Sequence, residues 1–174
     1  PGRNGGGAVE TPLVLVCTHA KRDTCCAVKG RPLAAELVED YPDIVWETSH
    51  TKGHRFAPSV MLMPWGYSFG RMNKEAAAQM IAAAARGKYF YPVNRGRGIF
   101  GPRGQVAELA VARALIDAGE ELSYGQLTAT DSGEVSHIDG RRWRVTLEER
   151  EVEGVVSSCG DAPKTGQAIG ASGV

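Results

Sequence analysis

Two cysteines and two histidines are the residues of this chain best suited to bind a metal. Cys17 and Cys26 have eight residues between them, and His50 and His54 have three. Thiolate and imidazole are the ligands that iron-sulfur clusters and zinc share, and histidines at this spacing can turn onto one metal ion. A structural zinc site would favour a tighter cysteine spacing, whereas a loop of eight residues can wrap around a cluster. The four side chains therefore predict a metal centre.

The predicted secondary structure brings these four side chains to one edge of a sheet. Residues 13–17 and 44–47 are short apolar runs typical of buried parallel strands, and residues 27–41 between them have helical spacing. Cys17 ends the first strand, Cys26 begins the helix, and both histidines follow the second strand. Because ligands bind beyond the carboxyl ends of parallel strands, we expect all four to converge on one rim.

A second unit completes the predicted fold. Strands at residues 60–63 and 67–71 flank a turn of hairpin length, and Asn73 then caps an alanine-rich helix that ends at Gly87. A βαβ unit followed by a ββα unit is the minimal core of a thioredoxin-like fold. The predicted fold class is therefore α/β, with a mixed sheet and helices on its faces.

The chain is predicted to divide into four segments. Residues 1–11 are a glycine-rich flexible arm, and residues 12–94 are the thioredoxin-like domain. Residues 95–156 add an amphipathic helix, at residues 105–118, and a β-meander as an appendage. Residues 157–174 are small and polar and are predicted to be a flexible tail.

Composition narrows the class of protein. Lysine plus arginine and aspartate plus glutamate balance at 20 each, so no global charge favours nucleic acid. The longest apolar stretches are too short for a bilayer and no signal peptide stands out, which predicts a cytoplasmic protein without a membrane partner. Three of the four cysteines fall within ten residues, which suits metal or redox chemistry better than a disulfide framework.

A glycine-rich stretch fits the dinucleotide-binding pattern. It contains Gly96, Gly98 and Gly101 and precedes a predicted helix. Pro102 interrupts the junction between glycines and helix, and a meander follows instead of a buried parallel strand. We therefore expect a loop that packs near the centre or meets a partner, and no nucleotide site.

Two stretches of the sequence resemble the sucrase/ferredoxin-like family. They run from Cys17 through Gly30-Arg31-Pro32-Leu33 and from residue 46 to residue 57, and the match is densest over residues 13–71. Proteins of this family are thioredoxin-like ferredoxins, commonly with another lobe ahead of this domain, and they often have glycine where this chain has Lys52. The resemblance implies a 2Fe-2S cluster, with these ligands: Cys17, Cys26, His50 and His54.

The other cysteines and histidines are expected to be bystanders. Cys25 could replace Cys26, but the spacing in the family favours Cys26, which leaves Cys25 as a packed or spare thiol. His19 could be a ligand or a hydrogen-bond donor beside the cluster, but an exposed loop imidazole is the simpler interpretation. His137 is predicted to be a surface imidazole, and Cys159 a free thiol in the tail.

The implied function is electron transfer by a protein without substrate chemistry of its own. Replacing two thiolates by neutral imidazoles removes about two negative charges from the cluster's surroundings and raises its potential. Each imidazole keeps a second ring nitrogen, so we expect proton-coupled reduction and a potential that falls as pH rises. Arg55 could donate to the cluster, and a basic rim could dock an acidic redox partner, either a reductase or an acceptor. Solvated loop charge is the simpler interpretation of that rim: Lys21, Arg22 and Lys52.

Two other functions remain open on the same residues. A zinc-stabilised interaction domain would use the same four ligands but would be colourless and free of acid-labile sulfide. A thioredoxin-like thiol-disulfide oxidoreductase would use a disulfide among Cys17, Cys25 and Cys26, although the Cys-x-x-Cys motif of such enzymes is missing.

Overall fold

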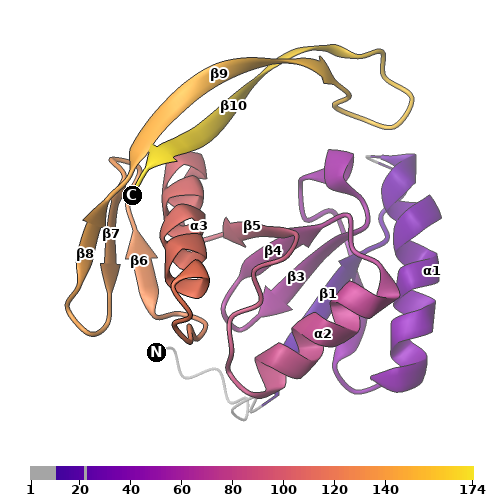
Figure 1. Ribbon diagram of the computed structural model, residues 1–174. Helices are drawn as coiled ribbons and strands as arrows, with labels where there is room; N and C mark the ends of the chain where they lie inside the picture. The colour runs from indigo at the N-terminus through magenta and orange to yellow at the C-terminus, as the bar shows by residue number, and fades with distance from the viewer. Residues whose placement is uncertain (1–10, 22) are drawn as a thin grey trace, which may run out of the picture.

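A five-stranded mixed sheet forms the centre of the protein (Figure 1). The computed structural model describes residues 11–21 and 23–174. The strand order is β2-β1-β3-β4-β5, with β1 and β2 parallel and every other pair of neighbours antiparallel. The strands are β1 (Leu13–Cys17), β2 (Val45–Thr48), β3 (Ser59–Met63), β4 (Tyr67–Gly70) and β5 (Asn94–Arg97).

Two helices pack on one face of this sheet. α1 (Thr24–Asp40) connects β1 to β2, and α2 (Lys74–Ala85) follows β4; the two helices also contact each other. Alternate strand residues face them, and the shared core includes Val14, Val16, Leu33, Leu37, Leu62, Phe69, Ala77 and Met80. Leu15 and Met61 alternate with these residues and are only half-buried on the opposite face.

The order of elements confirms the predicted thioredoxin-like fold. A parallel β1-α1-β2 unit is followed by the antiparallel pair β3-β4 and by α2, as expected from the apolar runs. α1 begins three residues earlier than its apolar spacing indicates, because Asp23 caps it: the Cys25 N–H donates to Asp23 Oδ1 at 2.8 Å. Cys26 therefore lies in the first turn of the helix.

The glycine-rich stretch serves packing. β5 is an antiparallel edge strand of the main sheet, whereas a dinucleotide motif follows a buried parallel strand. Gly101 caps the next helix, α3 (Pro102–Asp117), and a Cβ there would lie 2.1 Å from Oδ2 of Asp131. Glycine therefore leaves room for the Asp131 carboxylate where α3 meets the second sheet.

A smaller layer follows α3. It is a three-stranded antiparallel sheet, and with α3 it encloses a second core that includes Val111, Leu115, Leu127 and Val135. Its strands are β6 (Leu127–Ala129), β7 (Glu134–His137) and β8 (Arg142–Arg144). This layer is part of the predicted meander, whose last predicted strand, residues 143–152, is divided between β8 and a longer strand at residues 146–155 that belongs to another sheet.

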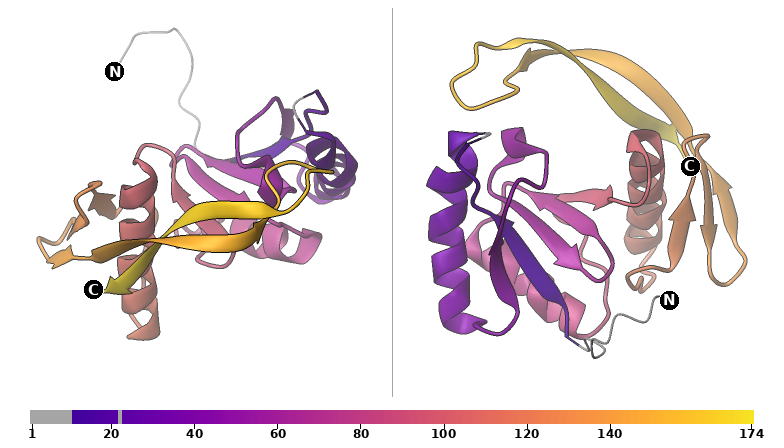
Figure 2. Two further views of the ribbon diagram at one scale, coloured as in Figure 1. Left: turned by 90° about the horizontal axis from the view of Figure 1, so that it is seen from above. Right: turned by 180° about the vertical axis from the view of Figure 1, so that it is seen from behind.

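The prediction of a flexible tail is wrong for residues 164–173, which form a strand. β9 (Thr146–Val155) and β10 (Lys164–Gly173) pair antiparallel in a long hairpin that arches from α3 towards α1 (Figures 1 and 2). The small, polar residues of β10 carry no apolar periodicity, so its order comes from backbone pairing with β9. Two such strands are marginal alone, and contacts of both with α3 support them.

Two further predictions concern the N-terminal arm and the absence of a membrane-spanning helix. The arm at residues 1–11 falls outside the described residues, apart from Thr11, which is exposed. Within the described residues, no helix combines the length and the apolar character needed to span a membrane.

Candidate metal centre

Cys17 and Cys26 meet beneath the rim of the main sheet. Cys17 is the last residue of β1, Cys26 lies in the first turn of α1, and each is 1% exposed. Both are free thiols, and their side chains interact while Ala57 packs against them. The structure therefore brings together the two cysteines that the sequence selects.

Gly30 makes this meeting possible. It lies one turn after Cys26 in α1, where a Cβ would fall 2.2 Å from the carbonyl oxygen of Cys17. Only glycine lets the helix backbone approach the end of β1 this closely. The close approach fixes the first turn of α1, and with it Cys26, beside Cys17.

Burial controls the chemistry of the two thiols. Loss of hydration and, to a smaller extent, the adjacent Cys17 together raise the pKa of Cys26 to about 12. In the metal-free protein Cys26 is therefore a protonated thiol and a poor nucleophile. Since metals bind the thiolate, a cation in this site would have to displace the proton.

The histidine loop follows the neighbouring strand. Cys17 pairs with Thr48 in the parallel register, and the Thr18 N–H donates to the Thr48 carbonyl at 3.2 Å, so both strand ends meet at one edge. His50 comes two residues later and is half-buried. His54 begins the short helix η1 (His54–Phe56), and its side chain lies outside what the structure describes.

His19 differs from the exposed imidazole that the sequence predicts. It is half-buried, its ring centroid lies 6.4 Å from that of His50, and within the described part of the chain its Nδ1 is buried without a hydrogen-bond partner. A buried ring nitrogen without a partner is costly, so His19 belongs to the polar surroundings of the site. The prediction that His137 lies on the surface is also wrong. Its side chain is 9% exposed, and its Nδ1 lies 2.8 Å from Oδ1 of Asp139.

The donor types fit an iron-sulfur cluster. Two buried thiols and the half-buried imidazole of His50 come to one rim, and the backbone of η1 places His54 on the same loop. Ala57 packs against the two thiols and limits the access of solvent to them. Cys17, Cys26, His50 and His54 are the residues that would hold the cluster.

The prediction of free thiols for Cys25 and Cys159 is wrong. The two form a disulfide with a Cα–Cα distance of 5.7 Å, across 134 residues of sequence. The Cys159 N–H donates to Asp23 Oδ2 at 2.9 Å, so the carboxylate that caps α1 also binds the tip of the hairpin. Asp23 and the two sulfurs cluster within 4.8 Å, but the disulfide consumes both sulfurs as metal ligands.

Positive charge surrounds the histidine loop. Lys21, Lys52 and Arg55 are exposed, whereas Arg22 lies outside the described residues. Sequence reasoning missed Arg95 on β5, whose guanidinium lies against Gly53, between the two histidines of the loop. No local sequence motif indicates this position of Arg95, because only the pairing of β5 with β4 brings it beside the histidine loop.

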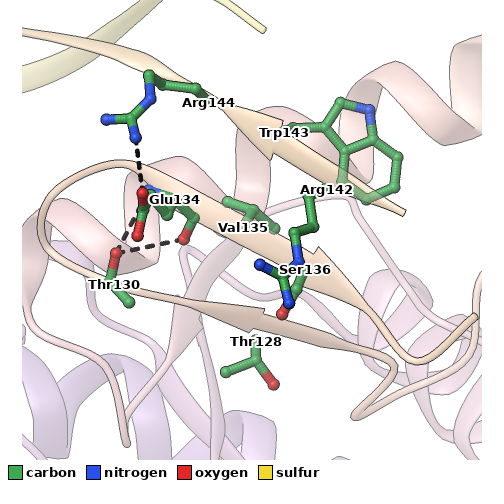
Figure 3. A pocket seen from close by; sticks show the side chains of 8 residues that line it. All are labelled: Thr128, Thr130, Glu134, Val135, Ser136, Arg142, Trp143 and Arg144. Carbon is green, nitrogen blue, oxygen red and sulfur yellow. Dashed lines mark hydrogen bonds and ion pairs between the residues drawn. The ribbon is translucent and has the colours of Figure 1, made fainter. Parts of the chain in front are cut away.

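A separate concave surface, which encloses a volume of about 530 Å³, lies on the three-stranded sheet (Figure 3). It is lined by residues from β6, β7 and β8 that include Thr128, Ser136 and Trp143, and by none of the candidate ligands. Arg144 pairs with Glu134 at 2.6 Å across this surface, and Arg142 adds a further positive charge. This surface has no part in the metal centre.

Solved structures similar to this chain are iron-sulfur proteins. A thioredoxin-like [2Fe-2S] ferredoxin from Aquifex aeolicus is 16% identical, covers 52% of this chain and 94% of its own, and has a TM-score of 0.45. The 1.5 Å crystal structure of the wild-type Aquifex ferredoxin is 17% identical, covers 45% of this chain and 89% of its own, and has a TM-score of 0.36. Similarity at this level assigns neither cofactor nor ligands.

The sequence comparisons are more decisive. No curated protein matches the chain. The model of the sucrase/ferredoxin-like family matches residues 7–96, which is more than half of the 174 residues and includes the cysteine loop and the histidine loop. The chain belongs to the sucrase/ferredoxin-like family.

Proposed function

We propose that this protein is a ferredoxin-type electron carrier with a 2Fe-2S cluster bound by Cys17, Cys26, His50 and His54. One observation carries the proposal: two free, buried thiols meet at the edge of the sheet where the histidine loop begins. Membership of the family supports it. The bound cluster would supply one-electron exchange, and the chain's own residues would set its position and surroundings.

The two pairs of ligands have different supports. The cysteines come from the end of a strand and the start of a helix, which hold them rigidly and away from water. The histidines come from a loop, where His50 is half-buried. A ring nitrogen of a ligating histidine that reaches solvent can exchange its proton, so we include proton-coupled reduction in the proposal.

The partner would be an acidic redox protein, either a reductase or an acceptor. Exposed basic side chains beside the histidine loop, Lys21, Lys52 and Arg55, support this part of the proposal.

A cytoplasmic location stays a prediction. In a reducing compartment the Cys25–Cys159 disulfide would open, so the location also decides the state of the hairpin.

Iron and sulfide analysis tests the proposal directly. Protein purified without air should contain iron and acid-labile sulfide in equal amounts and show reddish-brown charge-transfer absorption. His54→Gln should bleach or destabilise the centre, whereas His137→Gln, a matched change in the appendage, should leave the spectrum unchanged. The reduction potential, measured between pH 6 and 9, should fall as pH rises.

The contrary outcomes are equally distinct. Colourless protein that contains zinc and no sulfide would replace the electron carrier by a zinc-stabilised interaction domain. A coloured protein with a potential independent of pH would keep the cluster and remove proton coupling. Equal spectra for the two histidine variants would exclude His54 as a ligand.

One observation favours a second candidate, a thiol-disulfide oxidoreductase. The Cys25–Cys159 disulfide lies at the start of α1, and its Cys159 is exposed. A thiol-disulfide exchange activity should survive His54→Gln and disappear in Cys25→Ser. The electron carrier predicts the reverse dependence for its absorption spectrum.

A further inference from the structure

Three arginines gather around one aromatic ring beside the histidine loop. The guanidinium carbons of Arg95, Arg55 and Arg71 lie 4.4, 4.7 and 5.7 Å from the centroid of the Phe56 ring. The residues come from β5, from η1 and from the turn after β4, so the fold assembles this arginine cluster from separate segments. The face of an aromatic ring attracts each cation, but it does not neutralise them.

The inner member of the arginine cluster is held tightly. A Cβ at Gly53 would lie 2.2 Å from the Arg95 guanidinium, and one at Gly70 would lie 2.9 Å from its Cδ. Burial lowers the pKa of Arg95, and the positive charge of Arg55 lowers it further. The cluster therefore holds like charges close together at a cost in free energy.

No carboxylate offsets this charge among the residues that the structure describes. Neither a hydrogen bond nor an ion pair links the side chains of Arg55, Arg71 or Arg95 to an acidic group there. Four other arginines pair with carboxylates: Arg103 with Glu149, Arg113 with Asp117, Arg141 with Glu120 and Arg144 with Glu134.

A cavity opens in front of the arginine cluster. Its volume is about 410 Å³, and Arg55, Phe56 and Arg71 form one wall. The hairpin forms the other wall. Its lining residues run from Val152 to Val156, at the end of β9 and directly after it, and include Gln167 and Ala168 on β10. Figure 1 shows the hairpin arching over this side of the main sheet, where the disulfide anchors its tip. The space is of the size that small-molecule sites occupy.

We propose that this cavity binds a small oxyanion, a carboxylate or a phosphate, through the guanidiniums of Arg55 and Arg71. Arginine forms paired, charge-assisted hydrogen bonds with the oxygens of both groups. Arg95 also lies over the Phe56 ring and adds positive charge without lining the cavity. The hairpin wall leaves room for a small molecule and favours it over the flat surface of a partner protein.

Glu153 limits the affinity of this site. It lies on the hairpin wall and is exposed, so it brings one negative charge opposite two guanidiniums. The wall charges remain positive in sum, but Glu153 repels a bound anion. Removing its charge should therefore tighten binding, and this is the opposite effect to the removal of an arginine.

Anion titration of the 174-residue chain tests the proposal. Inorganic phosphate in one arm and acetate in the other are titrated by calorimetry at constant ionic strength, with chloride as the reference anion. Phosphate, acetate or both should bind saturably, and the tighter arm identifies the chemistry of the anion. Arg71→Gln and Arg55→Gln should each weaken binding about tenfold, the usual effect of losing a hydrogen bond to a charged group. Glu153→Gln should strengthen binding.

Arg86→Gln is the matched control. Arg86 caps α2, is exposed and does not line the cavity, so the same change of charge there should leave the affinity unchanged. The proposal is overturned if neither anion binds more tightly than chloride, or if Arg71→Gln, Arg55→Gln and Arg86→Gln weaken binding equally. Failure of one arginine variant to fold leaves the other and Glu153→Gln to decide.

Discussion

Cys25 and Cys26 are neighbours in sequence with opposite surroundings. Successive residues of a helix point about 100° apart, so in the first turn of α1 one side chain faces inward and the other faces the hairpin. Cys26 is buried against Cys17, whereas Cys25 is half-buried and bonded to Cys159. Of these two neighbours, Cys26 is therefore the proposed cluster ligand and Cys25 forms the cross-link.

Serine variants of these two cysteines should give opposite results. Cys26→Ser removes a proposed ligand, so we expect it to lose the iron while it keeps the Cys25–Cys159 disulfide. Cys25→Ser should keep the iron and lose the cross-link. Because this disulfide spans 134 residues, the entropy of the unfolded chain assigns it up to about 5 kcal/mol of stability. Iron analysis and urea denaturation measure the two effects.

Two results would contradict this assignment. Iron retained by Cys26→Ser and lost by Cys25→Ser would make Cys25 the ligand. Equal unfolding free energies for Cys25→Ser and the parent protein would mean that the cross-link adds no stability in solution.

At the residue scale, sequence reasoning reached the groups whose chemistry is visible in their type. Cysteine and histidine are recognisable as possible ligands at any position, so the sequence alone predicts that Cys17 and Cys26 lie together, and the structure confirms their contact. The partner of Cys159 was not predictable, because only the folded hairpin brings it to Asp23 and Cys25. Arg95 was missed for the same reason, since its neighbours belong to other strands.

At the scale of elements, the contact between α1 and β1 determines the distance between the two thiols. Gly30 is the closest point of that contact, with no space for a Cβ beside the Cys17 carbonyl. Gly30→Ala should therefore push α1 away from the strand and separate Cys26 from Cys17. We expect a destabilisation of about 1–3 kcal/mol, typical of overpacking, and a lower iron content.

Gly170→Ala is the control for this prediction. Gly170 lies in β10, its φ is not in the left-handed region, and nothing lies within 4 Å of a Cβ built there. Denaturation and iron analysis of both variants separate the loss of space from the general effect of glycine replacement. Equal stability and iron content for the two variants would mean that the approach of α1 does not govern the site.

The elements themselves were predictable to different degrees. β1 was predicted to the residue, because Leu13–Cys17 is a continuous apolar run, and the Asn73 cap of α2 is present with the Ala76 N–H donating to Asn73 Oδ1 at 2.9 Å. β10 was not predictable, because its small and polar residues have no buried face to impose a period of two. Its partner strand gives it order, and a pattern in one segment cannot show that.

At the scale of the whole molecule, a buried carboxylate joins the two cores. Glu108 of α3 is 0% exposed, and the Tyr67 hydroxyl of β4 donates to its Oε1. The backbone N–H of Arg97 donates to Oε2 at 3.3 Å. Tyr89 packs against both cores, so the main sheet and the appendage share a continuous interior around Glu108.

This carboxylate should make stability depend on pH. Burial raises the pKa of Glu108 from an ordinary value of 4.5 to about 7, although hydrogen bonds from Tyr67 and Arg97 oppose the shift. The folded protein therefore holds a proton that the unfolded chain releases between these values. The stabilisation is complete below pH 4.5 and is lost as pH rises to about 7, by up to about 3 kcal/mol from this group.

Glu108→Gln isolates this contribution. Glutamine cannot ionise, so the variant should lack the fall in unfolding free energy that the parent shows between pH 5 and 7, whatever its stability at a single pH. Urea denaturation at pH 5, 6, 7 and 8 measures the slope, and Glu148→Gln, on the exposed surface of β9, is the matched control that should keep it. If the parent and the Glu108→Gln variant fall equally, another group titrates in this range and the carboxylate between the cores is ionised throughout. A slope that disappears only in the Glu108 variant would establish that the appendage and the main sheet unfold as one unit, because a group on α3 can set the stability measured for the whole chain only if both cores open together.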